Sequence, residues 1–137
     1  MFMYLISDIA KKSGLSTDTI RFYEKKGFIQ PNFRANNQYR YYSDDVLKRL
    51  IFMKHCRALN MSLKEIEKLL HLEEKPKQNC NVVNQLIDQH IQDITNKMNE
   101  LEQLKSQLSK LRSRCLEAST VDQCQILKTL ESDSDFA

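Results

Sequence analysis

The stretch ISDIAKKSGLSTDTIRFYEKKG, residues 6–27, decides the fold of the amino-terminal part of the chain. A first helix is predicted after Ser7, a good N-cap, because apolar residues follow it at helical spacing. Gly14 interrupts this pattern, and Ser16 can cap a second helix from Thr17 to about Lys26, ended by the glycine that follows. Two short helices joined by a glycine-containing turn predict a helix-turn-helix over about residues 6–26.

Three further elements are predicted after the helix-turn-helix. Residues 31–42 are aromatic and basic with an Asn-rich turn, which favours a small β-hairpin, or wing. Ser43 begins a third helix that carries an apolar stripe, and Ser62 with Glu65 forms the capping box of a fourth. Residues 73–79, which include a proline, are interpreted as a linker.

A long helix is predicted from about residue 80 to residue 116. Apolar or cysteine residues recur along it in steps of three or four, at positions 80, 83, 87, 91, 94, 98, 101, 104, 108, 111 and 115. A single helix is too thin to bury such a seam, so the pattern predicts a coiled coil with a second helix. We therefore expect a mainly α fold, with a winged helix-turn-helix domain followed by a long coiled-coil dimerisation helix.

The net charge of +3 is unevenly distributed over the 137 residues. Residues 1–75 hold 14 Lys and Arg against 9 Asp and Glu, a net +5, whereas residues 76–137 hold 7 against 9, a net −2. The basic first part indicates a polyanion partner. The apolar stretches are too short for a membrane span, and the first residues lack the features of a signal peptide, so we expect a cytoplasmic protein without a membrane partner.

The candidate DNA-contacting residues lie on the second predicted helix, in the wing and beyond it. Small hydroxyls and arginines on the exposed side of that helix can reach base edges and phosphates in a major groove, and wing cations and phenols suit the flanking backbone. Any one of these residues could equally be a solvated surface residue. The arrangement of helix-turn-helix, basic wing and dimerising helix is a more specific indication of DNA binding than any single residue. The candidates are Ser16, Thr17, Thr19, Arg21 and Tyr23 on the helix, Arg34, Tyr39 and Arg40 in the wing, and Arg57 and Lys64 beyond it.

Several of these segments resemble the MerR family of transcription regulators. The matching motifs are ISDIA at 6–10, GLS at 14–16, TIRFYEKKG at 19–27, YRYY at 39–42 and MSLKEI at 61–66. The resemblance covers residues 4 to about 72 closely and the long helix more loosely, and the family's wing usually has Gly where Gln38 stands. It implies a winged helix-turn-helix and a homodimer joined by an antiparallel pair of long helices.

The resemblance also implies how such a protein acts. Family members bind double-stranded promoter DNA whose two recognition elements are spaced too far apart. They bend and untwist it, so that inducer binding lets RNA polymerase engage both elements. Deformation of uncontacted base pairs is a physical route to this control. An enzyme is not expected, because the sequence has neither a phosphate-binding glycine loop nor a Ser/His/Asp or Cys/His arrangement with an obvious cleft.

Three of the four cysteines form a candidate metal site. Cys80 and Cys115 are 35 residues apart on one predicted helix, roughly 52 Å at 1.5 Å per residue, so they cannot share a metal ion within one chain. In an antiparallel pair centred near residues 97 and 98, each Cys115 lies beside Cys80 of the partner subunit, and a loop can return Cys124 to the same place. This geometry gives two equivalent sites per dimer, each with Cys115 and Cys124 from one chain and Cys80 of the partner subunit.

The residue types indicate which metal ions this site prefers. Three thiolates with no nearby carboxylate or imidazole make a soft site, whereas zinc usually takes four ligands. The segments that contain Cys80 and Cys124 resemble the cadmium/lead-responsive branch of the family, which implies Cd(II) or Pb(II) as inducer and heavy-metal resistance or efflux genes as targets. The mercury branch shares the spacing of three cysteines, so Hg(II) remains open, and Zn(II) is a further alternative.

Other interpretations of these residues also stay open. The protein could be a thiol redox regulator, or a DNA-binding dimer in which the metal is purely structural. The cysteines could simply be small buried apolar residues, as free cysteine often is, and this is the preferred interpretation for Cys56 in the third helix. The histidines, His55, His71 and His90, are expected at the surface or in packing, with His90 or water as a possible additional ligand.

These expectations divide the chain into four segments. Residues 1–75 are the DNA-binding domain, and residues 80–116 are the dimerisation helix. Residues 115–130 are the metal-binding loop and a short terminal helix, and the acidic residues 131–137 are an expected mobile tail.

Overall fold

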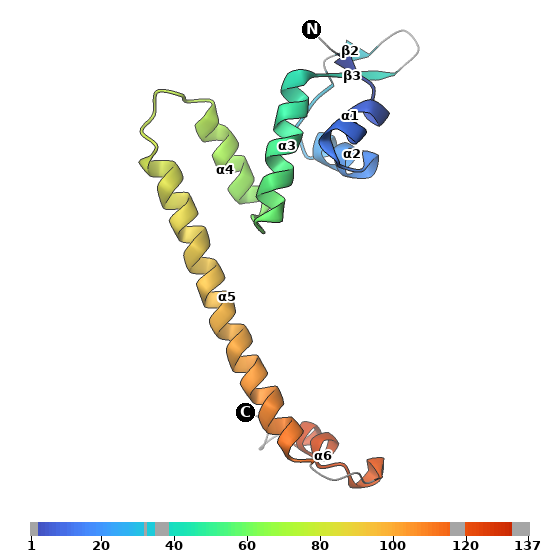
Figure 1. The fold of residues 1–137 in the computed structure, drawn as a ribbon, viewed down its shortest axis with the longest axis vertical. Helices are drawn as coiled ribbons and strands as arrows, with labels where there is room; N and C mark the ends of the chain where they lie inside the picture. Colours follow the sequence, from blue (N-terminus) through green and yellow to red (C-terminus); the bar gives the residue numbers. More distant parts are fainter. Residues whose placement is uncertain (1–2, 32, 35–38, 116–119, 133–137) are drawn as a thin grey trace. The chain divides into compact units, whose positions relative to one another are not determined.

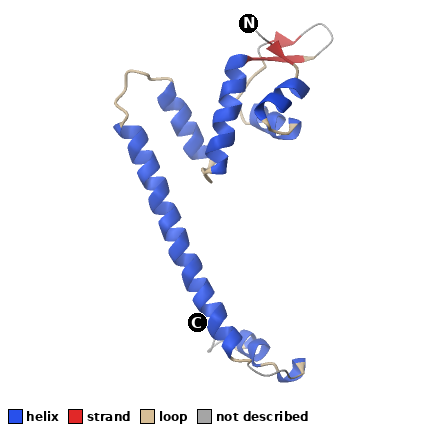
Figure 2. Ribbon diagram, viewed as in Figure 1, coloured by secondary structure: helices blue, strands red, loops and turns tan. Residues whose placement is uncertain are grey.

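A computed structural model describes residues 3–31, 33–34, 39–115 and 120–132 of the chain. These residues form six α-helices, one 3-10 helix and a small sheet, which confirms the predicted mainly α class (Figure 2). The chain divides into two compact units, Met1–Asn84 and Gln85–Ala137. None of the helices in the described part of the chain is long and apolar enough to cross a membrane.

The first unit contains a small antiparallel sheet with strand order β1-β3-β2. Its strands are β1 (Met3–Tyr4), β2 (Phe33–Arg34) and β3 (Arg40–Ser43). β2 and β3 are the two sides of the predicted wing, and β1 adds a strand that the sequence pattern did not predict, through the pairing of Tyr4 with Tyr42. Residues 35–38, which include Gln38 of the predicted wing turn, lie outside the described residues.

The helix-turn-helix is formed by α1 (Ile6–Ser13) and α2 (Thr17–Lys25). Gly14 ends α1 in the left-handed conformation (φ 76°), which a residue without a side chain adopts at little cost, and Ser16 caps α2 as predicted. The predicted N-cap at Ser7 is wrong. The chain passes from β1 directly into α1, and the carbonyl oxygen of Leu5 accepts the first helical hydrogen bonds, with no side-chain cap.

The predicted third and fourth helices are confirmed as α3 (Asp44–Ala58) and α4 (Leu63–Glu73). Ser43 caps α3, and Ser62 with Glu65 forms the predicted capping box of α4. Apolar side chains from α1, α2, β3, α3 and α4 make one core, so the wing strand and α2, the second helix of the helix-turn-helix, share a scaffold. The largest fully buried members are Ile9, Ile20, Tyr42, Leu50, Met53 and Ile66.

The predicted long helix is present as α5 (Asn81–Ser113), but it ends before the predicted residue 116, so that Cys80 and Cys115 lie just outside it. After it come the 3-10 helix η1 (Val121–Gln123) and α6 (Gln125–Glu131) (Figure 1). Along the middle of α5, from Ile91 to Leu108, the apolar residues of the predicted seam are exposed in the single chain, among them Met98, Leu101 and Leu108, each above 60%. The seam residues nearer the two ends of the helix, Val83, Ile87 and Leu111, are half-buried. Such a continuous exposed apolar stripe indicates a surface that is covered by a partner.

Candidate nucleic-acid interface and metal centre

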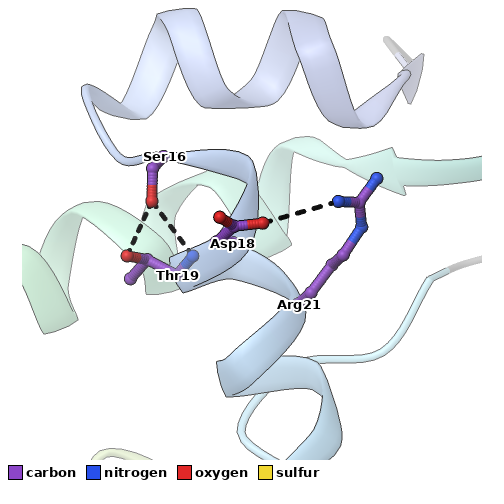
Figure 3. A network of polar contacts seen from close by, with 4 residues as sticks. All are labelled: Ser16, Asp18, Thr19 and Arg21. Atoms are coloured by element: carbon purple, nitrogen blue, oxygen red, sulfur yellow. Dashed lines mark hydrogen bonds and ion pairs between the residues drawn. The ribbon is translucent and has the colours of Figure 1, made fainter.

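The beginning of α2 is held by a small hydroxyl network (Figure 3). The Ser16 Oγ accepts a hydrogen bond from the Thr19 backbone N–H at 3.1 Å and lies 2.8 Å from the Thr19 hydroxyl oxygen. Both hydroxyls therefore fix the first turn of α2, in addition to any contact they make with DNA. Thr17, at the start of the helix, is half-buried.

Arg21 is exposed on α2. Its guanidinium lies 3.7 Å from the Asp18 carboxylate, one turn earlier, with the two side chains 58% and 95% exposed (Figure 3). An ion pair this exposed contributes little, so it does not prevent Arg21 from turning towards a phosphate.

The expectation that Tyr23 lies on the exposed side of the helix is wrong. Tyr23 is 5% exposed, and its ring lies 5.9 Å from that of Phe22 and 6.1 Å from that of Phe28. It follows the fully buried Ile20 by three residues and so shares the core face of α2. A contact with DNA is limited to the small exposed part of the ring. The neighbouring Phe22, 45% exposed with Lys26 Nζ 5.6 Å from its ring centre, is the exposed aromatic that sequence reasoning missed.

In the wing, Arg40 forms an ion pair with Glu24 of α2, and the Tyr42 hydroxyl donates a hydrogen bond of 3.2 Å to the same carboxylate. Burial and the neighbouring Glu24 carboxylate raise the pKa of Tyr42 above its ordinary value.

Tyr39 is 60% exposed, as expected for a residue that meets DNA. Nothing is described for the side chain of Arg34. Glu24 gave no signal in the sequence, because its partners lie 16 and 18 residues away.

Arg21 and Arg40 line the same surface cavity, of about 550 Å³. It lies where the recognition helix, the wing and the start of α1 meet, and Tyr39 contributes to its wall. Two guanidinium groups from different elements therefore face one open space. This arrangement suits an anionic ligand with more than one phosphate.

The remaining predicted contacts lie around the α3–α4 turn. Arg57 donates a hydrogen bond of 2.9 Å to the carbonyl oxygen of Met61 and lines a cavity beside α2 with Asp18, Thr19 and Phe22. Lys64 lies in another cavity, which Lys26 and Arg49 also line. The first unit thus presents cations on α2, β3, α3 and α4.

Replacing Arg21 with alanine is expected to weaken operator binding while leaving metal binding intact. Loss of one phosphate contact should lower the affinity about three- to tenfold and reduce the slope of log affinity against log salt by about one. A salt series of DNA titrations measures both. Lys110→Ala, which removes a cation from α5, serves as the control and should leave both values unchanged. An unaltered affinity for Arg21→Ala over the series would remove this residue from the interface.

Cys80 and Cys115 flank the long helix. α5 begins directly after Cys80, where the Asn79 side-chain oxygen accepts the Asn81 N–H at 2.9 Å, and it ends two residues before Cys115. Helix α6 is tied back to this end, because the Arg114 guanidinium donates a hydrogen bond of 3.3 Å to the Thr129 hydroxyl. Cys80 and Cys115 are therefore about 50 Å apart along α5, so the two thiols of one chain cannot bind the same metal ion.

Cys115 and Cys124 lie together, with their thiol groups in hydrogen-bonding contact. The N–H of Leu127, and more weakly that of Ile126 and the Cys115 thiol, hold the pKa of the Cys124 thiol below its ordinary value, against the opposing effect of burial. Two soft sulfur donors, one of them with a lowered pKa, fit a soft metal ion. Among the described residues of one chain, no three His, Cys, Asp or Glu side chains gather into a metal-binding group.

The positions of Cys56 and of the three histidines agree with roles in packing or at the surface. Cys56 is 6% exposed in the core of the first unit, and burial raises its pKa. His90 is buried in α5, whereas His55 and His71 are exposed.

The thiols are expected to react at very different rates in the metal-free protein. Cys124 should be alkylated fastest at neutral pH, because its lowered pKa keeps a larger thiolate fraction, whereas the buried Cys56, with a raised pKa, should react only on unfolding. Timed iodoacetamide labelling and peptide mass spectrometry measure this. Cys56 is the internal control: Cd(II) should protect Cys124 and leave Cys56 unchanged. Equal rates for the two thiols would contradict the description of both sites.

A basic helix-turn-helix with a wing, joined to a long helix with an exposed apolar seam, defines a DNA-binding regulator. Residues 4–73 match the MerR helix-turn-helix regulatory proteins, and residues 47–111 match the DNA-binding region of MerR proteins. The chain therefore belongs to the MerR family of transcription regulators.

Known proteins extend this likeness beyond the DNA-binding unit. A ZntR homolog from Haemophilus influenzae is 38% identical over 80% of this chain and 81% of its own length. A probable heavy metal-dependent transcriptional regulator from the same organism is 38% identical over 91% of this chain and 97% of its own. The crystal structure of PbrR691 from Ralstonia metallidurans CH34 in complex with lead(II) has a TM-score of 0.84 and 38% identity, covering 93% of this chain and 98% of that one. These relatives are transcription regulators rather than enzymes.

Proposed function

We propose that this protein is a homodimeric, metal-responsive regulator that distorts promoter DNA and so controls genes for soft heavy-metal resistance or efflux. Cd(II) or Pb(II) is the inducer, and RNA polymerase at the promoter is the further partner. The observation that carries the proposal is the meeting of the Cys115 and Cys124 thiols beside the start of α6. Similarity to a lead(II)-bound regulator and to a heavy metal-dependent regulator supports the same conclusion.

Each metal site takes Cys115 and Cys124 from one chain and Cys80 of the partner subunit. The exposed seam of α5 supports this arrangement, because an antiparallel pair of these helices brings opposite ends together. When bound, a soft divalent ion supplies three strong bonds to sulfur that link the two chains. The residues of this chain provide the thiolates, and the pKa of the Cys124 thiol is held below its ordinary value.

The DNA interface comprises α2, the wing and the α3–α4 region. Arg21 and Arg40 are its central cations, since they line one cavity, and Arg57 lies beside α2. The other members are Ser16, Thr17, Thr19, Arg34, Tyr39 and Lys64, whereas the buried Tyr23 is left out. Arginines placed on separate elements can neutralise several phosphates of one duplex, which fixes the protein on DNA before sequence is read.

A titration of the purified, reduced dimer with Cd(II), Pb(II), Hg(II), Zn(II) and Cu(I) tests the inducer. Thiolate-to-metal charge-transfer absorption should saturate at two ions per dimer, with Cd(II) or Pb(II) giving the largest change in transcription from a promoter that the protein binds. A larger transcriptional response to Hg(II) or Zn(II) would replace the proposed inducer. Activation by peroxide in the absence of metal would identify a thiol redox regulator instead.

A further inference from the structure

Glu24 joins the recognition helix to the wing. Its side chain is 15% exposed, receives the guanidinium of Arg40 in an ion pair, and accepts a hydrogen bond of 3.2 Å from the Tyr42 hydroxyl. Arg40 and Tyr42 are two residues apart on β3 and so project from the same face of the strand. One carboxylate on α2 thus holds two side chains of the wing strand.

This contact fixes Arg40 in a defined place. A largely buried carboxylate is costly unless it is paired, and Arg40 and Tyr42 satisfy both of its oxygens. Arginine has five N–H donors in a rigid fork, so the pairing with Glu24 leaves other donors of Arg40 for a second anion. The Arg40 side chain is 37% exposed and lines the same cavity as Arg21.

We propose that Glu24 is a positioning residue for DNA binding, which holds Arg40 of the wing in a fixed relation to Arg21 of the recognition helix so that both guanidinium groups meet phosphates of one duplex. The inference rests on the DNA interface of the proposed function. It assigns to an acidic residue a favourable part in binding a polyanion. The charge of Glu24 alone predicts the opposite, because removing a carboxylate near the duplex should strengthen binding. The sign of the effect therefore separates positioning from simple electrostatics.

A double-mutant cycle in DNA affinity tests this positioning role. The probe is a fluorescently labelled duplex that the wild-type protein selects from a random-sequence pool, and the proteins are the full-length dimers of wild type, Glu24→Ala, Arg40→Met and the double variant. Arg40→Met is expected to weaken binding roughly tenfold and to reduce the salt slope by about one. Glu24→Ala should weaken it about three- to tenfold, and the double variant should bind no more weakly than Arg40→Met, because the two residues act as one unit.

Two further variants serve as controls. Glu24→Gln keeps the size of the side chain and one oxygen acceptor for Arg40, and its amide N–H can donate to the Tyr42 hydroxyl oxygen, so it should lose less affinity than Glu24→Ala. Asp18→Ala removes an equal charge from the exposed face of the same helix, where the carboxylate is 95% exposed, and should leave binding equal or tighter. Thermal unfolding of each dimer shows whether the fold is kept. If Glu24→Ala does not fold, Glu24→Asp takes its place in the cycle, because it keeps the charge but is too short to hold both partners.

Several results would overturn the inference. Unchanged or tighter binding by folded Glu24→Ala would show that electrostatics dominates. An equal loss in the wild-type and Arg40→Met backgrounds would show that Glu24 acts through something other than Arg40. If Arg40→Met has no effect while Arg21→Ala weakens binding, Arg40 leaves the proposed interface and the role of Glu24 falls with it. In that case the metal response and the remaining DNA contacts still stand.

Discussion

A heterodimer of two differently disabled chains is expected to bind one tight Cd(II) or Pb(II) ion. One protomer carries Cys80→Ser, and the other carries Cys115→Ser together with Cys124→Ser. Neither homodimer has a complete three-thiolate site. In the heterodimer, the first protomer supplies Cys115 and Cys124, and Cys80 of the partner subunit completes one site, while the opposite site has no cysteine ligands.

The expectation follows from the length of α5, whose flanking cysteines are about 50 Å apart in one chain. Charge-transfer absorption in tandem-tagged, purified heterodimers measures the stoichiometry, which should be one ion against two for wild type. Cys56→Ser in both chains is the control and should leave two ions, because this thiol is buried in the apolar core of the first unit. Absence of a tight ion in verified heterodimers would disprove either the antiparallel register or the assignment of the three ligands.

Leu101→Asp is expected to break the dimer even when metal is present. Leu101 is 61% exposed in the single chain, and the substitution removes this apolar side chain from both copies of the seam. At about 1.5–3 kcal/mol for each buried leucine, and with a carboxylate left in an apolar contact, the dissociation constant of the dimer should rise at least roughly a hundredfold. Sedimentation equilibrium measures this constant.

Gln103→Asp is the matched control, since this exposed residue lies nearly opposite the seam and receives the same new charge. It should remain dimeric. Wild-type protein treated with a chelator should also remain dimeric, because the apolar seam rather than the thiolates holds the chains together. A monomer after chelation would favour the alternative in which the metal is a structural link and carries no signal.

Local sequence rules predicted most of the helices. Ser16, Ser43 and the pair Ser62 and Glu65 cap the helices they were expected to cap, because capping depends on residues within one turn. The same kind of local rule wrongly predicted Ser7 as the N-cap of α1. There the start of α1 is set by the preceding strand, whose pairing with β3 joins residues about 40 positions apart.

The candidate sites were predictable in composition but not in detail. The exposed position of Arg21 and the return of Cys124 to Cys115 follow from helix spacing and loop length. Tyr23 lies three residues after the buried Ile20, a spacing that places both on the core face of α2 in spite of the tyrosine hydroxyl. Glu24 could not be recognised from the sequence at all, since its role depends on a wing strand that reaches it only in the folded unit.

The apolar seam of α5 is close to a palindrome. Counted from a midpoint between residues 97 and 98, Ile94 mirrors Leu101, Ile91 mirrors Leu104, and Ile87 mirrors Leu108. Under the proposed antiparallel pairing, isoleucines in one half of the helix therefore pack against leucines in the other half of the partner helix. Each substitution changes two symmetry-related contacts of the dimer. A change of volume at Leu101 must be compensated at Ile94 of the same gene product. Substitutions in the two halves of this helix should therefore occur together, as they do in the contact surfaces of two interacting proteins.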